Sequence, residues 1–590
     1  MLKQFASIIN MDNPGHYYHW SIVTISAANL ILIFLMVLVF LLALILPFPG
    51  SKNKFLHEEK ESSDFKENYL NNNSDMWTAK IRNLWMRFLP PSKLIPDSQP
   101  AYVGSWIYVF GVATLAALFM VIVSGFALAI GGVDWWHTTV VGHFFNSIHL
   151  WSVELFMSFM VIHLWGKFWM AAWRGRRALT WMTGVLAFLI SVIAAFTGYL
   201  SQQNFDSQWI ATNGKDALNA TGIGAFFNLM NFGQMITWHI VLIPLALITL
   251  VGGHILLVRV RGVSHPLPVK MARGCNAILS QKVSDKADWT GPNRKYDIVK
   301  EGSFAVLVVF ILVIGLSFLL SSPDKPPVTV QSWSNISPAD FMGTVVSELN
   351  GTSETANYGP PYNNGQKNVQ KIIVSPQLFS GIRQPIDSAN TFVINPLNKL
   401  AVNNTQLKLA LNQYTSASTD SKQTWLTNYS NALKDVSFAN SKIYVPNGNY
   451  GPVGLIVASE LNYARSGAID TALLSQQPFY GSNYTKPLLF LEDGRYFSSL
   501  AQKEHLIGTQ WGVMNETGSY PGQPWLWLYT LWYQIPSFSS SANVDLIAIL
   551  MTLVSTVLLM MIPFIPIVRD IPRYIPVHKI IYRNWNKSRK

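Results

Sequence analysis

Seven long apolar runs constrain the fold of this 590-residue chain more than any other feature of its sequence. Each run is long enough to cross a hydrocarbon core of about 30 Å as a helix. Half of the residues are hydrophobic and only 13% are charged. The sequence therefore predicts an all-α membrane protein, a bundle of about seven transmembrane helices at residues 19–48, 102–130, 144–172, 180–200, 235–259, 303–321 and 543–568.

The basic residues lie in the loops between these runs. Lys and Arg concentrate in residues 51–100, 174–177, 259–300 and 569–590. Loops of this kind follow the positive-inside pattern, so the net charge of +12 does not indicate a nucleic-acid partner. We expect the four basic segments in the cytoplasm and the chain in the plasma membrane. The N-terminus and the 322–541 stretch then lie outside.

The 322–541 stretch is too long for a connecting loop and predicts a folded extracytoplasmic insertion. Its β-branched and aromatic runs, such as residues 371–376 and 487–497, favour strands, with helices expected around 402–414 and 421–436. We therefore expect a mixed, strand-rich insertion. It contains six N-x-S/T sequons, which favour external glycosylation, at Asn335, Asn350, Asn403, Asn428, Asn483 and Asn515.

The division of the chain follows from these observations. Cys275 is the only cysteine, which excludes an internal disulfide framework and a Cys-ligated iron–sulfur or zinc site within the chain. We expect six parts: an extra transmembrane helix at 1–50, a cytoplasmic linker at 51–100, a helical core at 101–321, the insertion at 322–517, a loop with the last transmembrane helix at 518–568, and a basic tail at 569–590.

Two histidines mark the third apolar run, residues 144–172. His149 and His163 are fourteen residues apart, which is close to four helical turns. Both imidazoles therefore share one helix face, about 21 Å apart along the axis. This spacing predicts one imidazole near each surface of the membrane.

A second histidine pair occupies the 235–259 run. His239 and His254 are fifteen apart, slightly more than four turns, and Pro244 offers a kink that absorbs the offset. By the orientation of the loops, both histidine-bearing helices run from outside to inside. His149 therefore pairs in depth with His239, and His163 pairs with His254.

Two imidazole pairs at two depths favour two haems. Ligation at both axial positions leaves no open site on the iron, which favours electron transfer. A single intramembrane histidine is more often a hydrogen-bonded packing residue, but four at these spacings on two helices that run the same way favour ligation. Zinc is disfavoured because it needs three or four ligands at one depth.

Glycines recur at the same interval. Gly111 and Gly125 are fourteen apart, and so are Gly184 and Gly198. A macrocycle edge between helices needs neighbours without a Cβ at both depths. The alternative is close helix packing at small residues. The match to the histidine interval favours contact with haem.

With these residues in place, the chain resembles the cytochrome b family of quinol–cytochrome c reductases, the bc1 and b6f complexes, over residues 100–320 and 518–568. The segments that carry the resemblance are the histidine spacing with Pro244, the run Arg259–x2–Gly262–x2–His265–Pro266, the segment Gly198-Tyr199 to Trp209-x-Ala211-Thr212, and the spacing of Pro521 to Pro536. Tyr529 stands at the position of the family's quinol-facing tyrosine.

The chain also departs from the family pattern. The family's Pro-Glu-Trp-Tyr reads Pro521-Gly522-Gln523-Pro524, so the carboxylate that accepts a quinol proton is missing. Three further replacements are Gln202-Gln203 for Pro-Trp, Asn146 for a propionate-binding arginine, and Ser152 for a haem-facing glycine. The chain is similar to divergent cytochromes b of archaeal respiratory complexes, some of which carry haem A-type groups.

The resemblance implies the di-haem subunit of an oxidoreductase complex. It implies two haems, b-type or else A-type, and a quinol/quinone substrate oxidised near the outer surface. It further implies a Rieske iron–sulfur partner, other respiratory subunits with a terminal oxidase among them, a dimer, and a lipid environment.

Glu154 and Asp206 are the candidates to replace the missing proton acceptor, beside Tyr529. An intramembrane carboxylate such as Glu154 is functional by default, although it could instead bond a neighbouring helix. For Asp206 the alternative is a solvated loop charge. Two further groups have both functional and anchoring interpretations, namely Trp135, Trp136 and His137 at the outer surface, and Arg259, Arg261 and His265 at the inner surface.

Two other functions stay open from the sequence. One is a di-haem conduit or anchor in an oxidase or dehydrogenase complex without quinol chemistry at the outer site. The other is a haem-free transporter or a glycosylated surface receptor.

Overall fold

The structure is a computed structural model, and it describes residues 8–13, 15–48, 80, 84, 86, 95–96, 98–267, 292–439, 442–477, 481–507, 517–522 and 527–588. Several predicted features lie outside these residues. They are most of the 51–100 linker, most of the 259–300 segment with Cys275, the sequon at Asn515, and Gln523 and Pro524 of the loop.

Seven helices in the described residues are long and apolar enough to cross a membrane, which confirms the predicted all-α bundle. Their main segments are α1 (Ala27–Ile45), α5 (Val109–Gly131), α7 (Val140–Trp169), α8 (Ala178–Leu200), α11 (Ile243–Arg261), α13 (Ile298–Leu320) and α27 (Val544–Met561). Many of their large apolar side chains are exposed, for example Phe126, Leu245 and Phe310. Such surfaces are stable against lipid and not against water.

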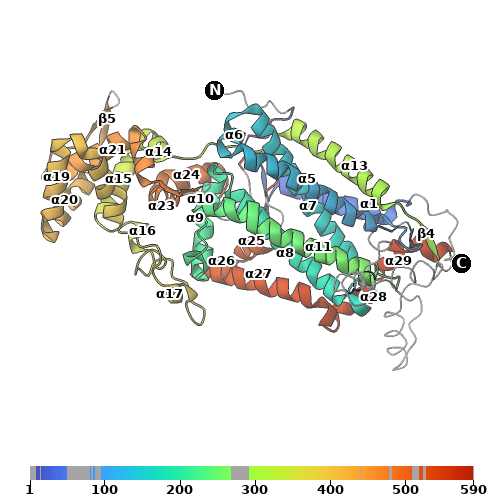
Figure 1. Ribbon diagram of the computed structural model, residues 1–590. Helices are drawn as coiled ribbons and strands as arrows, with labels where there is room; N and C mark the ends of the chain where they lie inside the picture. The colour runs from blue at the N-terminus through green and yellow to red at the C-terminus, as the bar shows by residue number, and fades with distance from the viewer. Residues whose placement is uncertain are drawn as a thin grey trace.

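Two helix pairs form the centre of the bundle. Helix α5 packs along α7, and α8 packs along α11, while α13 covers the first pair and α27 covers α8 (Figure 1). We call the end from which residues 322–541 extend the insertion end. The opposite end, which holds Arg174 and Arg177, is called the arginine end.

Short elements close the two ends of the bundle. The helices are α6 (Val133–Thr138), α9 (Phe205–Ala220), α10 (Phe232–Thr237), α25 (Trp527–Gln534), α26 (Pro536–Ser539), α28 (Ile571–Tyr574), α29 (Val577–Ile581) and α30 (Arg583–Ser588). Two antiparallel strand pairs accompany them, β1 (Tyr17–Trp20) with β2 (Val23–Ser26), and β3 (Ser98–Pro100) with β4 (Asn293–Lys295).

The insertion is mostly helical. Its helices are α14 (Val330–Ile336), α15 (Pro338–Leu349), α16 (Glu354–Asn357), α17 (Pro376–Ser380), α18 (Asn395–Leu400), α19 (Thr405–Ser416), α20 (Thr419–Ala432), α21 (Val453–Arg465), α22 (Ala468–Leu473), α23 (Thr485–Glu492) and α24 (Arg495–Lys503). Its described strands have three residues each, β5 (Ser437–Ala439) with β6 (Lys442–Tyr444) and β7 (Ser475–Gln477) with β8 (Gly481–Asn483).

The strand-rich prediction for the insertion is therefore wrong, whereas helices α19 and α20 confirm the two helices expected there. Residues 487–497, expected as strand, form the end of α23 and the start of α24. Leu488, Phe490 and Phe497 in this run are buried in the core of the insertion. Burial on helix faces in that core outweighs the strand preference of the aromatic residues.

The hydrophobic core of the insertion continues into the bundle. Phe205 and Ile210 of α9 and Phe232 of α10 belong to the same buried cluster as Trp333 and Phe490 of the insertion. The insertion is thus packed onto the two helices that follow α8 and precede α11.

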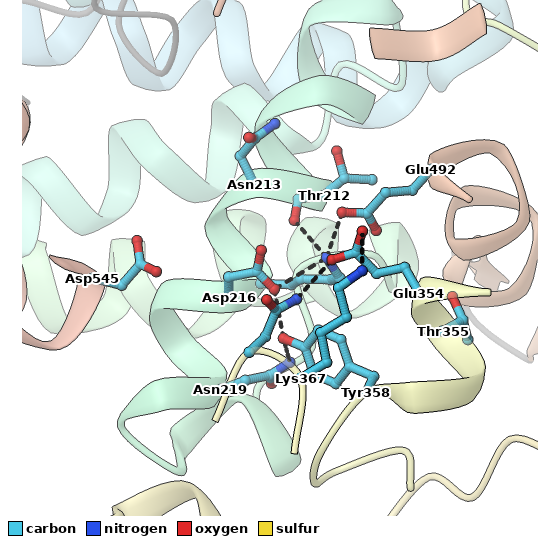
Figure 2. A network of polar contacts seen from close by, with 12 residues as sticks. Thr212, Asn213, Asp216, Asn219, Glu354, Thr355, Tyr358, Lys367, Glu492 and Asp545 are labelled. Atoms are coloured by element: carbon cyan, nitrogen blue, oxygen red, sulfur yellow. Dashed lines mark hydrogen bonds and ion pairs between the residues drawn. The ribbon is translucent and has the colours of Figure 1, made fainter. Parts of the chain in front are cut away.

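A buried lysine adds a polar connection at this junction. The ammonium group of Lys215 in α9 lies 2.7 Å from a carboxylate oxygen of Glu492 and 3.2 Å from one of Asp216. Asp216 also accepts a hydrogen bond of 2.5 Å from Tyr358 of the insertion (Figure 2). A buried cation with two carboxylate partners holds its neighbours in one geometry, because removal of either partner leaves charge uncompensated.

Candidate functional site

His149 of α7 and His239 of the adjoining helix face each other toward the insertion end. Their ring centres are 6.2 Å apart and their planes are nearly perpendicular, at 89°. A metal ion bonded at about 2 Å to one nitrogen of each ring would place the ring centres about 6 Å apart. The two imidazoles are therefore spaced to hold one metal ion between them.

His163 and His254 form the second pair, toward the arginine end. The two imidazoles lie close enough for their charges to interact. Lys167, one turn after His163, lies near both of them. The structure thus brings the four histidines together as two pairs at two depths. The described residues contain no cluster of three or more His, Cys, Asp or Glu side chains suited to a metal, so each pair offers two ligands and not four.

Each of the four spaced glycines lies against one histidine. A Cβ added to Gly198 would come 2.4 Å from the His239 ring, and one added to Gly125 would come 3.2 Å from the His149 ring. At the other level, a Cβ on Gly111 or on Gly184 would come 3.1 Å from the nearest ring, that of His163 or His254 respectively. The glycines therefore let each imidazole approach the neighbouring helix. Contact of these glycines with haem, which the sequence predicts, stays a prediction, and so does the alternative of close helix packing.

Hydrogen bonds hold three of the four imidazoles at the Nδ1 atom. His149 Nδ1 lies 3.0 Å from Ser124 Oγ, and His239 Nδ1 lies 2.9 Å from the Ala194 carbonyl oxygen. His254 Nδ1 lies 3.3 Å from Thr183 Oγ1. A partner at Nδ1 fixes the orientation of the ring and leaves Nε2 to bind a metal. The donor set and its support fit a bis-imidazole haem site.

The His163 ring differs from the other three. Its Nδ1 atom is buried and has no hydrogen-bond partner among the described residues. Gly111 lies directly against this edge of the ring. The position of His163 therefore depends on packing and not on a hydrogen bond at Nδ1.

One turn of π-helix accounts for the difference between the two histidine spacings, which are fourteen residues for His149 and His163 and fifteen for His239 and His254. Residues Trp238–Leu242, which include His239, form this turn immediately before Pro244. A π turn takes in one extra residue per turn, so fifteen residues cover nearly the rise that fourteen cover on α7. Pro244 lacks an N–H and cannot donate to the carbonyl four residues earlier. The offset is thus absorbed by a π turn beside the proline and not by a simple kink.

Tyr529 lies on α25, in the loop before the last transmembrane helix. Its hydroxyl oxygen is 2.8 Å from that of Tyr533, and Tyr533 donates a 2.6 Å hydrogen bond to Asp545 of α27. The sequence analysis missed Tyr533 and Asp545. The four-residue spacing of the two tyrosines on one helix face is the signal that could have found the first of them.

Asp206 is buried and is not the solvated loop charge that was the alternative to its catalytic role. One of its oxygens accepts from the Thr517 backbone N–H at 3.1 Å, and the other accepts from the Thr517 hydroxyl at 2.7 Å. Burial raises the pKa of Asp206 to about 7, against the opposing effect of the hydrogen bonds from Thr517. This carboxyl group ties α9 to the segment that leads into the loop.

Glu154 is buried on α7. It lies five residues after His149 and nine before His163, which places it about 140° and 180° round the helix from the two ligand candidates. Its carboxyl group therefore does not share the histidine face.

Asn146 and Gln202, two of the residues that depart from the family pattern, bond to each other. Gln202 Nε2 donates to Asn146 Oδ1 at 3.2 Å. The Gln202 carbonyl lies 2.6 Å from His137 Nε2, and His137 Nδ1 lies 2.8 Å from Asp324. Burial lowers the pKa of His137, but the hydrogen bond and charge of Asp324 outweigh it, so that the pKa is raised overall. His137 thus joins the bundle to the start of the insertion.

The basic cluster at the arginine end is largely occupied with the backbone. Arg174 donates to the His265 carbonyl at 2.5 Å, and Arg177 donates to the Gly262 carbonyl at 3.1 Å. Arg261 donates to the Arg176 carbonyl at 2.6 Å. These bonds fit the anchoring interpretation of Arg261, and binding of an inner quinone or of haem propionates by Arg259, Arg261 and His265 stays a prediction.

Comparison with known proteins finds similarity in the core of the chain. Residues 154–327 match the family model described as cytochrome b (N-terminal)/b6/petB. The matched range includes His163, His239 and His254, and it begins five residues after His149.

Individual relatives match over similar parts of the chain. A cytochrome bc complex cytochrome b subunit of Chlorobaculum thiosulfatiphilum is 29% identical over 141 residues, 22% of this chain and 33% of the relative. Cytochrome b6 of Heliomicrobium gestii is 26% identical over 137 residues, 21% of this chain and 64% of the relative. The menaquinol:cytochrome c reductase cytochrome b subunit of Geobacillus thermodenitrificans is 24% identical over 211 residues, 32% of this chain and 94% of the relative.

The match thus spans a third of the first of these relatives and just under two thirds of the second. A solved chain of a hyperthermophilic respiratory Complex III aligns with 70% of this chain and 98% of its own length. Its identity is 15% and its TM-score is 0.31, so we draw no conclusion about this chain from the alignment.

Proposed function

We propose that this chain, a divergent member of the cytochrome b family, is the di-haem subunit of a membrane complex that oxidises quinol. The observation that carries the proposal is the arrangement of four histidines as two imidazole pairs at two depths of a seven-helix bundle. When bound, two haems, b-type or else A-type, supply one-electron redox centres at these two depths.

Some residues of the chain bind the two irons, and others orient the residues that bind them. His149 and His239 hold one iron, and His163 and His254 hold the other. Ser124 and the Ala194 carbonyl set the ring orientation in the first pair. Oriented ligands limit the reorganisation that accompanies electron transfer, because the protein and not the solvent fixes the geometry.

Quinol oxidation is placed at the insertion end, beside Tyr529 and the 521–536 loop. This end faces outward if the basic segments lie in the cytoplasm. Asp206 and Glu154 stay candidate proton acceptors, with both carboxylate oxygens of Asp206 accepting from Thr517. One electron from quinol leaves for an external acceptor and the other enters the membrane through the first histidine pair.

The wider assembly follows the same proposal. It comprises a Rieske iron–sulfur partner, further respiratory subunits with a terminal oxidase among them, and a dimer in the plasma membrane. The insertion is glycosylated, and Asn335 and Asn403 are the exposed acceptors among its described sequons. The six-part division of the chain stays part of this proposal, and the insertion packs onto α9 and α10.

Two measurements on the purified complex test this function. Reduced-minus-oxidised spectra and a pigment extract determine whether two bis-imidazole haems are bound. Haem reduction by a quinol, with and without an inhibitor of the outer site, tests the substrate. A reducible haem pair without inhibitor-sensitive reduction by quinol would contradict the quinol assignment.

A second function, a di-haem conduit without quinol chemistry, is favoured by one observation. The family's loop glutamate is absent from Pro521-Gly522-Gln523-Pro524. In that case electrons enter the haems from another subunit and quinol does not reduce them. An absorption spectrum without any reducible haem band would instead favour the haem-free transporter or receptor.

A further inference from the structure

The hydrogen bonds of Tyr529 and Tyr533 run in one direction. Each phenol has a single proton to donate. Tyr533 uses its proton in the 2.6 Å bond to Asp545, so the 2.8 Å bond between the two hydroxyl groups is donated by Tyr529. The oxygen of Tyr529 is then left to accept a hydrogen bond from a further hydroxyl group. A series of hydrogen bonds that all point in one direction can carry a proton from Tyr529 to Asp545.

Asp545 is held from both sides. It lies in the first turn of α27, where the helix N-terminus stabilises a carboxylate. Gln370 of the insertion donates to its second oxygen at 2.5 Å and accepts from the Leu546 backbone N–H at 3.0 Å. The neighbouring Lys371 N–H donates to Asn543 at 2.8 Å. The insertion therefore fixes the position of the first turn of α27, which carries this carboxylate.

Besides Lys371 of the insertion, whose side chain is exposed, the charged groups near Asp545 belong to α9. Asp216 and Lys215 are close enough for their charges to act on it, and Figure 2 shows Asp545 across from Asp216 with no direct bond between them. Helix α26 and the adjacent end of α8, which also pack against α27, carry no charged residue. Asp545 itself is only partly buried, so protons can exchange with the solvent on that side.

We propose that Asp545 replaces the missing loop glutamate as the proton acceptor for quinol, reached through Tyr529 and Tyr533. This inference rests on the proposed function. The quinol O–H bond breaks as a new O–H bond forms on Tyr529. The Tyr529 proton passes to Tyr533, and the Tyr533 proton passes to the Asp545 carboxylate. The electron leaves quinol for a one-electron acceptor of the complex, which is an iron–sulfur or haem centre.

The acidities of the two phenols suit a relay. Burial raises the pKa of Tyr529 above its ordinary value, and the negative charge of Asp545 adds to the effect. Burial and the neighbouring Tyr529 and Asp545 raise the pKa of Tyr533 as well. Neither phenol is stable as an anion here. Each therefore passes a proton on in a concerted step and does not ionise beforehand.

The test uses Asp545→Asn, Tyr533→Phe and Asp545→Glu in the intact complex. The exposed Asp420→Asn, which also removes an acid from the first turn of a helix, is the matched control. Reduction of the bound haems by short-chain ubiquinol and menaquinol analogues is followed in single turnovers from pH 5 to 9. A haem spectrum of each variant verifies that the complex is assembled.

The expected results separate a relay from a structural role. Loss of a positioned general base costs on the order of 100-fold in rate. Asp545→Asn and Tyr533→Phe should both show such a loss, and Asp545→Glu should recover most of the rate. In the wild type the rate should fall as the pH drops, because a protonated carboxyl group accepts no proton. Asp545→Asn should lack this acid limb.

Two outcomes would overturn the relay. One is an Asp545→Asn complex with the wild-type rate, and the other is a slow one that keeps the wild-type acid limb. If instead the wild type shows no inhibitor-sensitive reduction by quinol, the proposed function fails and the relay fails with it. That result is visible before any variant is made, so the two failures are distinguishable.

Discussion

The two histidine pairs repeat one arrangement in two different surroundings. Toward the insertion end, His149 and His239 both have a hydrogen-bond partner at Nδ1, and the same end of the bundle holds the carboxyl groups of Asp206 and Asp545 and the ion-paired Lys215. Toward the arginine end, His163 has no such partner among the described residues, and the nearby charge is that of Lys167.

This difference fits separate tasks for the two ends under the proposed function. Carboxylates at the insertion end suit the acceptance of protons from a substrate that loses them. A cation beside the second pair favours the reduced state of the iron, since a positive charge stabilises an added electron. Under the proposed function, the common ligand set would bind two haems, and the unlike charges would favour electron flow from the insertion end toward the arginine end.

The largest expected effect comes from removing a ligand at one level. His149→Ala should abolish the haem at the insertion end and keep the other, whereas His163→Ala should do the opposite. Each variant should thus contain about half of the wild-type haem, because one imidazole cannot supply both axial bonds. Pigment content and redox titration measure this, with the exposed His19→Ala as control. Loss of the opposite haem would refute the assigned depths.

Gly198 and Gly125 test how closely the first imidazole pair must approach its neighbours. A Cβ at Gly198 would come 2.4 Å from the His239 ring, too close without displacement of the imidazole. Gly198→Ala should therefore weaken retention of that haem at least about tenfold, which corresponds to about 1.4 kcal/mol. At Gly125 the distance is 3.2 Å, so Gly125→Ala should retain more haem. Equal haem content in the two variants would contradict this ranking.

Asp206 should make the stability of the insertion end depend on pH. Its pKa is raised from 3.8 to about 7 in the folded chain, so between about pH 4 and pH 7 the folded state binds a proton that the unfolded state has lost. Stability from this group is full below pH 4 and falls as the pH rises through that window, by up to about 4 kcal/mol.

Asp206→Asn should remove this fall. The variant should match the wild type near pH 4 and exceed it at pH 8 in thermal unfolding of the complex. The exposed Asp420→Asn should keep the wild-type pH slope. An Asp206→Asn complex that loses stability with rising pH as steeply as the wild type would show that this carboxyl group is not the cause.

Replacement of Lys167 should have the smallest effect of these substitutions. It is the most direct test of the difference in charge between the two histidine pairs. Lys167→Gln should lower the midpoint potential of the haem at His163 and His254, on the order of 50 mV, and leave the other haem nearly unchanged. Lys300→Gln is the matched control, since this exposed lysine lies at the same end of the bundle on α13. Equal shifts of both haems in the Lys167 variant would mean that the lysine does not distinguish the two levels.

Much of the candidate site could be predicted because its periodicity is local. The intervals between the histidines and between the glycines depend only on helical rise and turn, and they place side chains at two depths without knowledge of the fold. A hydroxyl-bearing residue directly before Gly125, Gly184 and Gly198 is a further regular signal that was overlooked. Ser124 and Thr183, at two of these positions, are the partners of histidine Nδ1 atoms.

The contacts that bring separate segments together could not be predicted in this way. Tyr533 and Asp545 lie on different helices, and Gln370 lies in the insertion 175 residues before Asp545. No periodic sequence pattern connects these three residues. The strand prediction for residues 487–497 failed for a related reason, because their burial in a core shared with α9 and α10 decides their conformation.

The sequence by itself determined the seven spans and the two histidine levels, because lipid and helix geometry act on each segment separately. The tertiary structure decided which groups surround each level. In the folded chain Asp206 is buried, a π turn beside Pro244 contains the extra residue, and Gln370 of the insertion bonds to Asp545. The burial of Asp206 and the bond to Asp545 depend on packing between residues 311 and 175 positions apart in the sequence, which no local preference specifies.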